Sequence, residues 1–357
     1  MDEKNNNLYK QFNEGNRLYL DTVKGVAIFL MMWGHCVQYC ANGDFDFFEN
    51  GVFKFIYSFH MPLFMMVSGY LFFFSCKKRS LSELLIHRSQ ALLQPILFCT
   101  IVNYFITDVI SSRKISTIIS GQWLSKLGDL WFLWSVLAAC VVVGIAEKIT
   151  NNSFYKLLII FLGVGVVALF PNWTMNVYMY PYFVIGFYFC KHKDKLPSAI
   201  ISLKYSSLIL FPILLVFYDT KHYIYTTGII SSDSIKELLM IDFYRWLIGF
   251  IGSVFALVII ELLFKLPIFK NCISKPVSAL GIKSLQIYCM STSLLSFWLP
   301  EIYNKLCSMT GSNFFASNVI IYNFIFTPLL AIVYATGIYY VVMFMEKIKI
   351  SKIIFGR

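Results

Sequence analysis

Three ionisable residues occupy one apolar stretch near the start of this 357-residue chain. Lys24 and His35 lie eleven positions apart. That is about three helical turns, so a helix would place both side chains on one face, about 16 Å apart along its axis. Asp21 lies three positions before Lys24 and is correctly spaced to pair with it on a helix. Because ionisable groups at membrane depth are energetically costly, they indicate a functional site.

His35 is a candidate general base or proton carrier, because the pKa of an unperturbed imidazole, about 6.5, lies close to neutral pH. Lys24 is a candidate ligand for an anion, with Asp21 as its ion-pair partner. The alternative is a structural role, in which Lys24 and Asp21 pair for packing and His35 is a hydrogen-bonded core residue. The cost of placing charge inside a membrane favours the functional interpretation.

A second histidine, His60, lies in the next apolar stretch, directly before Met61 and Pro62. Pro62 lacks a backbone donor and crowds the carbonyl of Ser58, so we expect a kink that gives a ligand room beside His60. His60 is therefore a second candidate catalytic residue, one that would orient or share the proton. The alternative is a kinked packing helix whose histidine bonds a neighbouring carbonyl.

Basic residues follow this second stretch. Arg88 leads into the third apolar stretch and is a candidate for binding the phosphates of a nucleotide-bearing donor. The cluster formed by Lys77, Lys78 and Arg79 is better explained by itself as a topology signal. A serine, Ser80 or Ser82, is the expected N-cap of the helix that carries Arg88.

The composition predicts the elements that must position these residues. Of all residues, 58% are hydrophobic and only 14% are charged, which is typical of a polytopic membrane protein with one all-α domain over residues 1–357. We expect a bundle of about ten transmembrane helices, at residues 19–40, 52–75, 84–108, 129–146, 155–170, 175–190, 198–217, 241–264, 277–298 and 317–345.

The 30 lysine and arginine residues are concentrated in the segments that this arrangement places on the side of the termini, so both termini are expected to be cytoplasmic. The net charge of +11 is then a topology signal and not a sign of nucleic-acid binding. The first apolar run is too long for the core of a signal peptide and is expected to remain as the first helix.

Several other kinds of chemistry have no support in the sequence. It holds no G-x-S-x-G, P-loop or H-E-x-x-H motif, so hydrolases, nucleotide-driven enzymes and zinc proteases are not indicated. The nine cysteines are expected to be free thiols. His35, Cys36 and Cys40 match no metal-ligand spacing, so no metal site is expected.

The motifs taken together resemble acyltransferase family 3, the integral membrane O-acyltransferases, and most closely its fucose 4-O-acetylase-like or surface-polysaccharide acetyltransferase branch. The resemblance spans most of the chain. It is carried, in order, by Asp21-x-x-Lys24-Gly25, Gly34-His35, Phe59-His60-Met61-Pro62-Leu63-Phe64, Ser68-Gly69-Tyr70, Arg88, Gln94-Pro95, Leu130-Trp131-Phe132-Leu133, Leu280-Gly281 and Ser284-Leu285-x-Ile287-Tyr288.

The resemblance implies a roughly ten-helix bundle that transfers an acyl group, usually acetyl, from cytoplasmic acyl-CoA to a sugar hydroxyl. The family's essential histidine falls on His35, and its basic residue eleven positions earlier falls on Lys24. The chain departs from the family at Ala91, where a second basic residue is common, and at Ser291, where a histidine is common.

We therefore expect a multi-pass enzyme of the cell membrane, in a bacterium the inner membrane, that acetylates a cell-surface glycan or its lipid-linked precursor. His35 and His60 are the expected catalytic residues, and Lys24, Asp21 and Arg88 the expected donor-binding residues. Acyl-CoA is the expected donor substrate, with no tightly bound cofactor and no nucleic-acid partner. The alternative is a transporter or flippase of glycan intermediates, in which the same residues relay protons.

Overall fold

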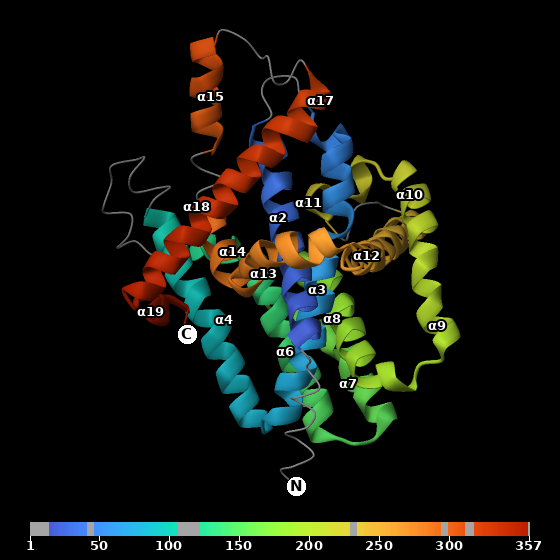
Figure 1. The fold of residues 1–357 in the computed structure, drawn as a ribbon. Helices are drawn as coiled ribbons and strands as arrows, with labels where there is room; N and C mark the ends of the chain where they lie inside the picture. The colour runs from blue at the N-terminus through green and yellow to red at the C-terminus, as the bar shows by residue number, and fades with distance from the viewer. Residues whose placement is uncertain are drawn as a thin grey trace.

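A computed structural model describes residues 14–40, 46–105, 122–228, 234–293, 299–310 and 318–355, and every regular element among them is a helix. Figure 1 shows α2 and α3 running through the middle of the molecule with α6 and α8 beside them. The turn between α3 and α4 lies at one end of this group, and α15 and α17 lie at the other. The all-α fold class is confirmed for the described part of the chain.

Seven helical segments of the described residues are long and apolar enough to cross a membrane. Five are single helices, namely α2 (Glu14–Tyr39), α3 (Gly51–Lys78), α4 (Leu81–Tyr104), α6 (Trp131–Ile149) and α12 (Ile235–Leu263). Two are composite runs, formed by α9 (Ser198–Ser202), η5 (Leu203–Ser206) and α10 (Ser207–Val216), and by α17 (Val319–Ile321), η9 (Tyr322–Phe326) and α18 (Thr327–Lys347).

Three further spans were expected, and each is helical where it is described. They correspond to α7 (Ser153–Val167), α8 (Trp173–His192) and the pair α13 (Ser274–Ile282) and α14 (Ser284–Ser293). The count of ten spans and the cytoplasmic side of the termini stay predictions. The remaining helices are α11 (Ile224–Thr227), α15 (Leu299–Thr310), α19 (Ile350–Phe355), η1 (Phe47–Glu49), η3 (Gln122–Gly128), η4 (Lys193–Lys195), η6 (Thr220–His222) and η7 (Phe269–Ile273).

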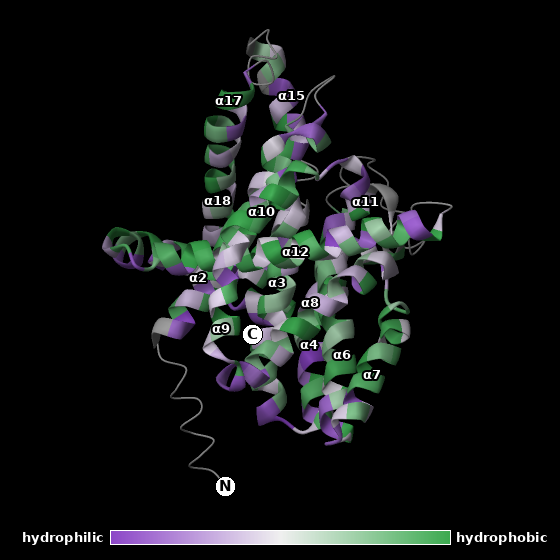
Figure 2. Cartoon of the chain, turned by 90° about the vertical axis from the view of Figure 1, so that its right-hand side faces the viewer, coloured by the Kyte–Doolittle hydropathy of each residue, from purple (hydrophilic) through white to green (hydrophobic). Residues whose placement is uncertain are grey.

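The apolar residues of this fold face both the core and the outside. The largest group of buried side chains comes from α2, α3, α6 and α8. Hydrophobic residues also cover α7, α10 and α12 in Figure 2, and hydrophilic residues gather near the two ends of the bundle. An apolar exterior with polar ends is the distribution that a lipid bilayer favours.

The helices that carry the candidate residues begin at side-chain caps. Asn50 caps α3 by accepting from the backbone N–H groups of Val52 and Phe53, at 2.9 and 3.2 Å. Ser80 caps α4 in a capping box with Glu83, which confirms the expected N-cap. α3 continues as one helix through Pro62.

Two helix pairs pack with backbone against backbone. A Cβ atom at Gly281 of α13 would lie 1.7 Å from the carbonyl oxygen of Asp21 on α2. A Cβ at Gly69 of α3 would lie 2.0 Å from the carbonyl oxygen of Phe183 on α8. Because only glycine permits such close approach, these positions fix how α2 and α3 sit in the bundle.

Replacing Gly69 by alanine is expected to destabilise the folded protein by about 1–3 kcal/mol, because the added methyl group overpacks the α3–α8 contact. Thermal unfolding in detergent measures the change. Gly165→Ala is the matched control, because nothing lies within 4 Å of a Cβ at Gly165 of α7. Equal melting temperatures for the two variants would contradict the proposed close packing.

Candidate active site

A cavity of about 210 Å³ lies inside the bundle, with walls from α2, α3, α4, α6 and α14. Lys24 and Arg88 both line it, although they lie far apart in the sequence. The rest of the lining is mainly apolar, with Met31, Phe64 and Phe132 among its residues. The structure thus brings together the two cationic residues that the sequence analysis assigned to donor binding.

Lys24 is held in place by one ion pair. Its Nζ atom lies 2.7 Å from Oδ1 of Asp21, as the spacing predicted, and 19% of its side chain is exposed. Arg17 approaches the same carboxylate at 3.9 Å. An ammonium group has three donors, so Lys24 retains donors for a second anion in the cavity that it lines.

Arg88 is positioned by α3. Its Nη2 atom donates to the hydroxyl of Ser75, and its guanidinium carbon lies 5.3 Å from the centre of the Phe72 ring. Its Nε atom is buried and has no hydrogen-bond partner. A buried guanidinium N–H without an acceptor is unfavourable, so an anionic ligand would stabilise this arrangement.

His35 is bonded to neighbours on α2 and α3. Its Nδ1 atom lies 3.3 Å from Oε1 of Gln38 and 3.1 Å from the hydroxyl oxygen of Tyr57. Because an amide oxygen only accepts, the contact with Gln38 assigns the proton to Nδ1. The lone pair is then on Nε2, which is the atom that can remove a proton from a substrate.

His60 has the same tautomer. Its Nδ1 atom lies 2.8 Å from the carbonyl oxygen of Ile56, which can only accept. The imidazole is 2% exposed, and its ring centre lies 4.9 Å from that of Tyr57. Tyr57 therefore contacts both histidines, and the structure gathers the two predicted catalytic residues around it.

Neither His35 nor His60 lines this cavity, but both lie close in sequence to residues that do. Lys24, Ile28 and Met31 line it from α2, and His35 is the next residue on the same face, one turn further. On α3 the lining includes Met61, the residue next to His60. The cavity thus has a cationic region at Lys24 and Arg88, and its lining residues on α2 and α3 come within about one helical turn of each histidine.

Sequence reasoning missed the role of Tyr57. Its ring stacks on Phe53 at 3.9 Å between centres and fills the space beside Gly34. A Cβ atom at Gly34 would lie 2.6 Å from Cε2 of Tyr57, so the glycine before His35 makes room for the ring. The available signal was the position of Tyr57 one helical turn before His60.

Removing the hydroxyl of Tyr57 is expected to slow acyl transfer about tenfold, because Tyr57→Phe loses one hydrogen bond that orients His35. The turnover number at saturating substrates measures the effect. Tyr39→Phe is the matched control, since the Tyr39 ring stacks on His35 at 5.5 Å and no hydrogen bond joins the two. Similar losses in both variants would contradict an orienting role for the Tyr57 hydroxyl.

Within the part of the chain that the structure describes, no group of three histidine, cysteine, aspartate or glutamate residues is arranged to hold a metal ion. The described cysteines are free, including Cys36 and Cys40 beside His35.

The sequence matches a family model described as "Acyltransferase domain" over residues 17–344. The chain therefore belongs to this acyltransferase family, which confirms the resemblance, and its class is that of a multi-helix membrane acyltransferase.

Two curated relatives are similar to part of the chain. Nodulation protein NolL of Mesorhizobium japonicum is 30% identical over 183 residues, which is 49% of this chain and 48% of the relative. Nodulation protein NolL of Sinorhizobium fredii is 31% identical over 201 residues, or 54% and 53% of the two chains. The chain thus spans about half the length of the curated relatives that it matches. No solved structure matches it.

Proposed function

We propose that this protein transfers an acetyl group from acetyl-CoA to a hydroxyl group of a sugar, in a cell-surface glycan or its lipid-linked precursor. The observation that carries the proposal is the cavity that Lys24 and Arg88 line, together with His35 and His60, which lie within about one helical turn of its lining residues Met31 and Met61. Anion-binding groups, a neutral base and a route between them are what transfer from a coenzyme A thioester requires.

The donor would bind through its phosphates. Lys24 supplies an ammonium group and Arg88 a guanidinium group, and the carboxylate of Asp21 pairs with Lys24. Arginine and lysine are the usual ligands of phosphate in proteins. The mainly apolar lining beyond them suits the acyl end of the donor.

The chemical step follows from the free Nε2 atom of His35. Nε2 removes the proton of the acceptor hydroxyl while that oxygen attacks the thioester carbonyl. The tetrahedral intermediate collapses with cleavage of the carbon–sulfur bond. The thiolate of coenzyme A that leaves is protonated by the imidazolium of His35. The products are a sugar ester and free coenzyme A. His60, linked through Tyr57, orients His35 or shares its proton.

The site is embedded among apolar helices, so the protein is a multi-pass membrane protein, and we place it in the inner membrane of a bacterium. The donor is then supplied from the cytoplasm at the end where Lys24 and Arg88 lie, which agrees with the predicted cytoplasmic termini.

Purified protein in detergent tests the function when it is given acetyl-CoA labelled in the acetyl group and a panel of p-nitrophenyl glycosides of fucose, galactose and N-acetylglucosamine. We expect labelled ester on at least one glycoside, with release of free coenzyme A. A glycan transporter would instead move a glycoside into proteoliposomes without modifying it. That result, with no labelled ester, would overturn the proposal.

A further inference from the structure

Tyr225 on α11 presents an aromatic ring beside the candidate active site. Its ring centre lies 5.8 Å from that of Tyr57 and 6.1 Å from that of Trp131, and both contacts are edge-to-face. Tyr225 is nevertheless 47% exposed. Tyr57 is hydrogen-bonded to His35. Tyr57 therefore lies between the exposed ring of Tyr225 and the proposed base.

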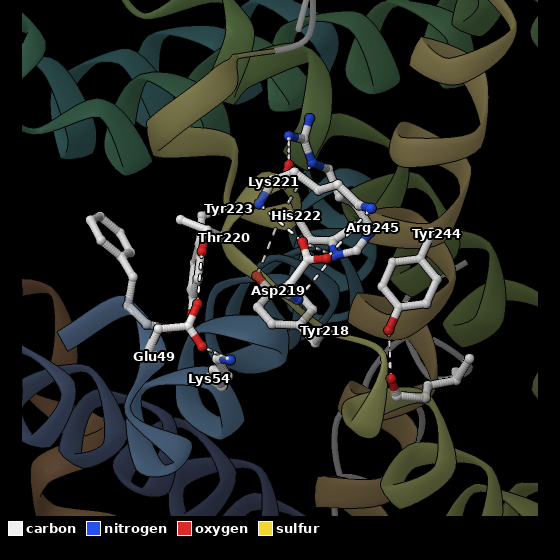
Figure 3. Close-up of polar contacts among 12 residues, drawn as sticks. Glu49, Lys54, Tyr218, Asp219, Thr220, Lys221, His222, Tyr223, Tyr244 and Arg245 are labelled. Atoms are coloured by element: carbon white, nitrogen blue, oxygen red, sulfur yellow. Dashed lines mark hydrogen bonds and ion pairs between the residues drawn. The ribbon is translucent and has the colours of Figure 1, made fainter. Parts of the chain in front are cut away.

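A buried arginine of α12 holds the segment that carries this tyrosine. Arg245 is 1% exposed, and its guanidinium donates to the carbonyl oxygens of Lys221, His222 and Gly228, at 2.5, 3.1 and 2.8 Å. It also pairs with Asp242, three positions earlier on α12, at 2.8 Å. Figure 3 shows Arg245 reaching into the turn formed by these residues. One side chain therefore fixes both ends of the segment 221–228.

The other side of the segment is tied to the start of α3. The hydroxyl of Tyr223 donates to the carbonyl of Phe48 at 3.0 Å, and the hydroxyl of Thr220 donates to Glu49 at 2.9 Å. Figure 3 shows Thr220 directed toward Glu49. The segment thus bridges α12 and the α3 end of the bundle.

A further hydrogen bond joins the start of the segment to the residue two positions before it. Burial lowers the pKa of His222, which keeps its imidazole neutral. Nδ1 can then accept from the backbone N–H of Asp219, at 3.0 Å. These contacts hold the backbone that carries Tyr225. We therefore expect a ligand that binds to this ring to avoid much of the entropy cost of ordering a loop.

The chemistry of this position fits a sugar. A pyranose ring has an apolar C–H face that packs on an aromatic ring and a rim of hydroxyl groups that need polar partners. The Tyr225 ring offers the apolar surface. It contacts the ring of Tyr57, which is hydrogen-bonded to His35. A sugar stacked on Tyr225 would have its rim directed to the base that must deprotonate it.

We propose that Tyr225, with Trp131 beside it, is the platform on which the acceptor sugar stacks, and that Arg245 is the positioning residue that holds this platform over the active site. The inference rests on the proposed function and adds where the acceptor binds. Donor and acceptor then reach His35 from different sides, the donor along the Lys24 and Arg88 cavity and the acceptor over Tyr225.

Steady-state kinetics of the purified, full-length protein test the platform, with acetyl-CoA as donor and, as acceptor, whichever p-nitrophenyl glycoside the wild type acetylates best. Tyr225→Ala is expected to raise the KM for the glycoside about tenfold, the size of effect expected for a lost aromatic contact, with the KM for acetyl-CoA unchanged. Tyr225→Phe keeps the ring and should restore the wild-type KM. Tyr155→Ala is the matched control, because Tyr155 of α7 is 55% exposed and lies outside the segment.

Arg245→Lys supplies an independent variant, because lysine keeps the charge but cannot span three carbonyl groups. It should raise the KM for the glycoside in the same direction, again with the KM for acetyl-CoA unchanged. An unchanged glycoside KM in Tyr225→Ala would overturn the platform while leaving the proposed function intact. If Tyr225→Ala fails to fold, Trp131→Leu replaces it with the same expectation. Absence of labelled ester from the wild type itself would overturn the proposed function and the platform with it.

Discussion

Replacing His35 by alanine is expected to lower the rate of acetyl transfer about 100- to 10,000-fold, which is the range that a positioned general base contributes. The variant loses the Nε2 lone pair, and neither Gln38 nor Tyr57, the two groups bonded to His35, is a base at neutral pH. Single-turnover transfer of labelled acetyl to a glycoside measures the chemical step directly. The folded state should persist, because the core residues of α2 beside His35, such as Met32 and Cys36, are unchanged.

A matched control separates catalysis from the loss of an imidazole as such. His192 lies at the end of α8 and its ring stacks on Tyr188, so His192→Ala should transfer acetyl at the wild-type rate. If His35→Ala retained more than about a tenth of the wild-type rate while remaining folded, His35 would not be the base.

Neutralising the two cations of the cavity is expected to weaken donor binding by about 10- to 100-fold for each residue, the size of a lost charge-assisted hydrogen bond. Arg88→Gln and Lys24→Gln should raise the KM for acetyl-CoA and leave the KM for the glycoside unchanged. Initial rates over a range of acetyl-CoA concentrations measure the effect. Lys77→Gln is the control, because Lys77 is an exposed cation at the end of α3 and does not line the cavity.

The ion pair of Lys24 requires a second variant. Lys24→Gln leaves Asp21 without its close partner, so a loss of activity in that variant alone has two explanations. In the double variant Asp21→Asn, Lys24→Gln no carboxylate is left unpaired. If Lys24 served only the ion pair, the double variant would recover wild-type donor affinity, and a donor-binding role for Lys24 would be contradicted.

Local spacing was sufficient to predict several parts of the site. The Asp21–Lys24 pair depends only on helical periodicity within α2, and it is present in the structure. The cap of α4 was expected at Ser80 or Ser82, and the structure has it at Ser80. Arg88 was expected near the donor-binding end because it precedes an apolar run, and it lines the same cavity as Lys24. Each of these predictions uses contacts within one helix or a clear polarity boundary.

The remaining parts depend on contacts between segments that are distant in sequence. Tyr57 reaches His35 only because α3 packs against Gly34 of α2. Arg245 pairs with Asp242 within α12, but its three carbonyl partners lie in a separate segment. A single sequence gives the polarity of each helix face but leaves open which faces meet. The contact of Tyr225 with Tyr57 could therefore not be predicted.

The proposed mechanism requires that the acetyl group of a donor bound at Lys24 and Arg88 reach the base at His35. The most direct measurement uses sealed proteoliposomes without an ion gradient, labelled acetyl-CoA and a glycoside, with wild type and His35→Ala compared side by side. We expect labelled glycoside ester from the wild type and none above background from the variant. Equal ester formation by both proteins, or unmodified glycoside carried across the membrane by the wild type with no ester formed, would contradict the claim.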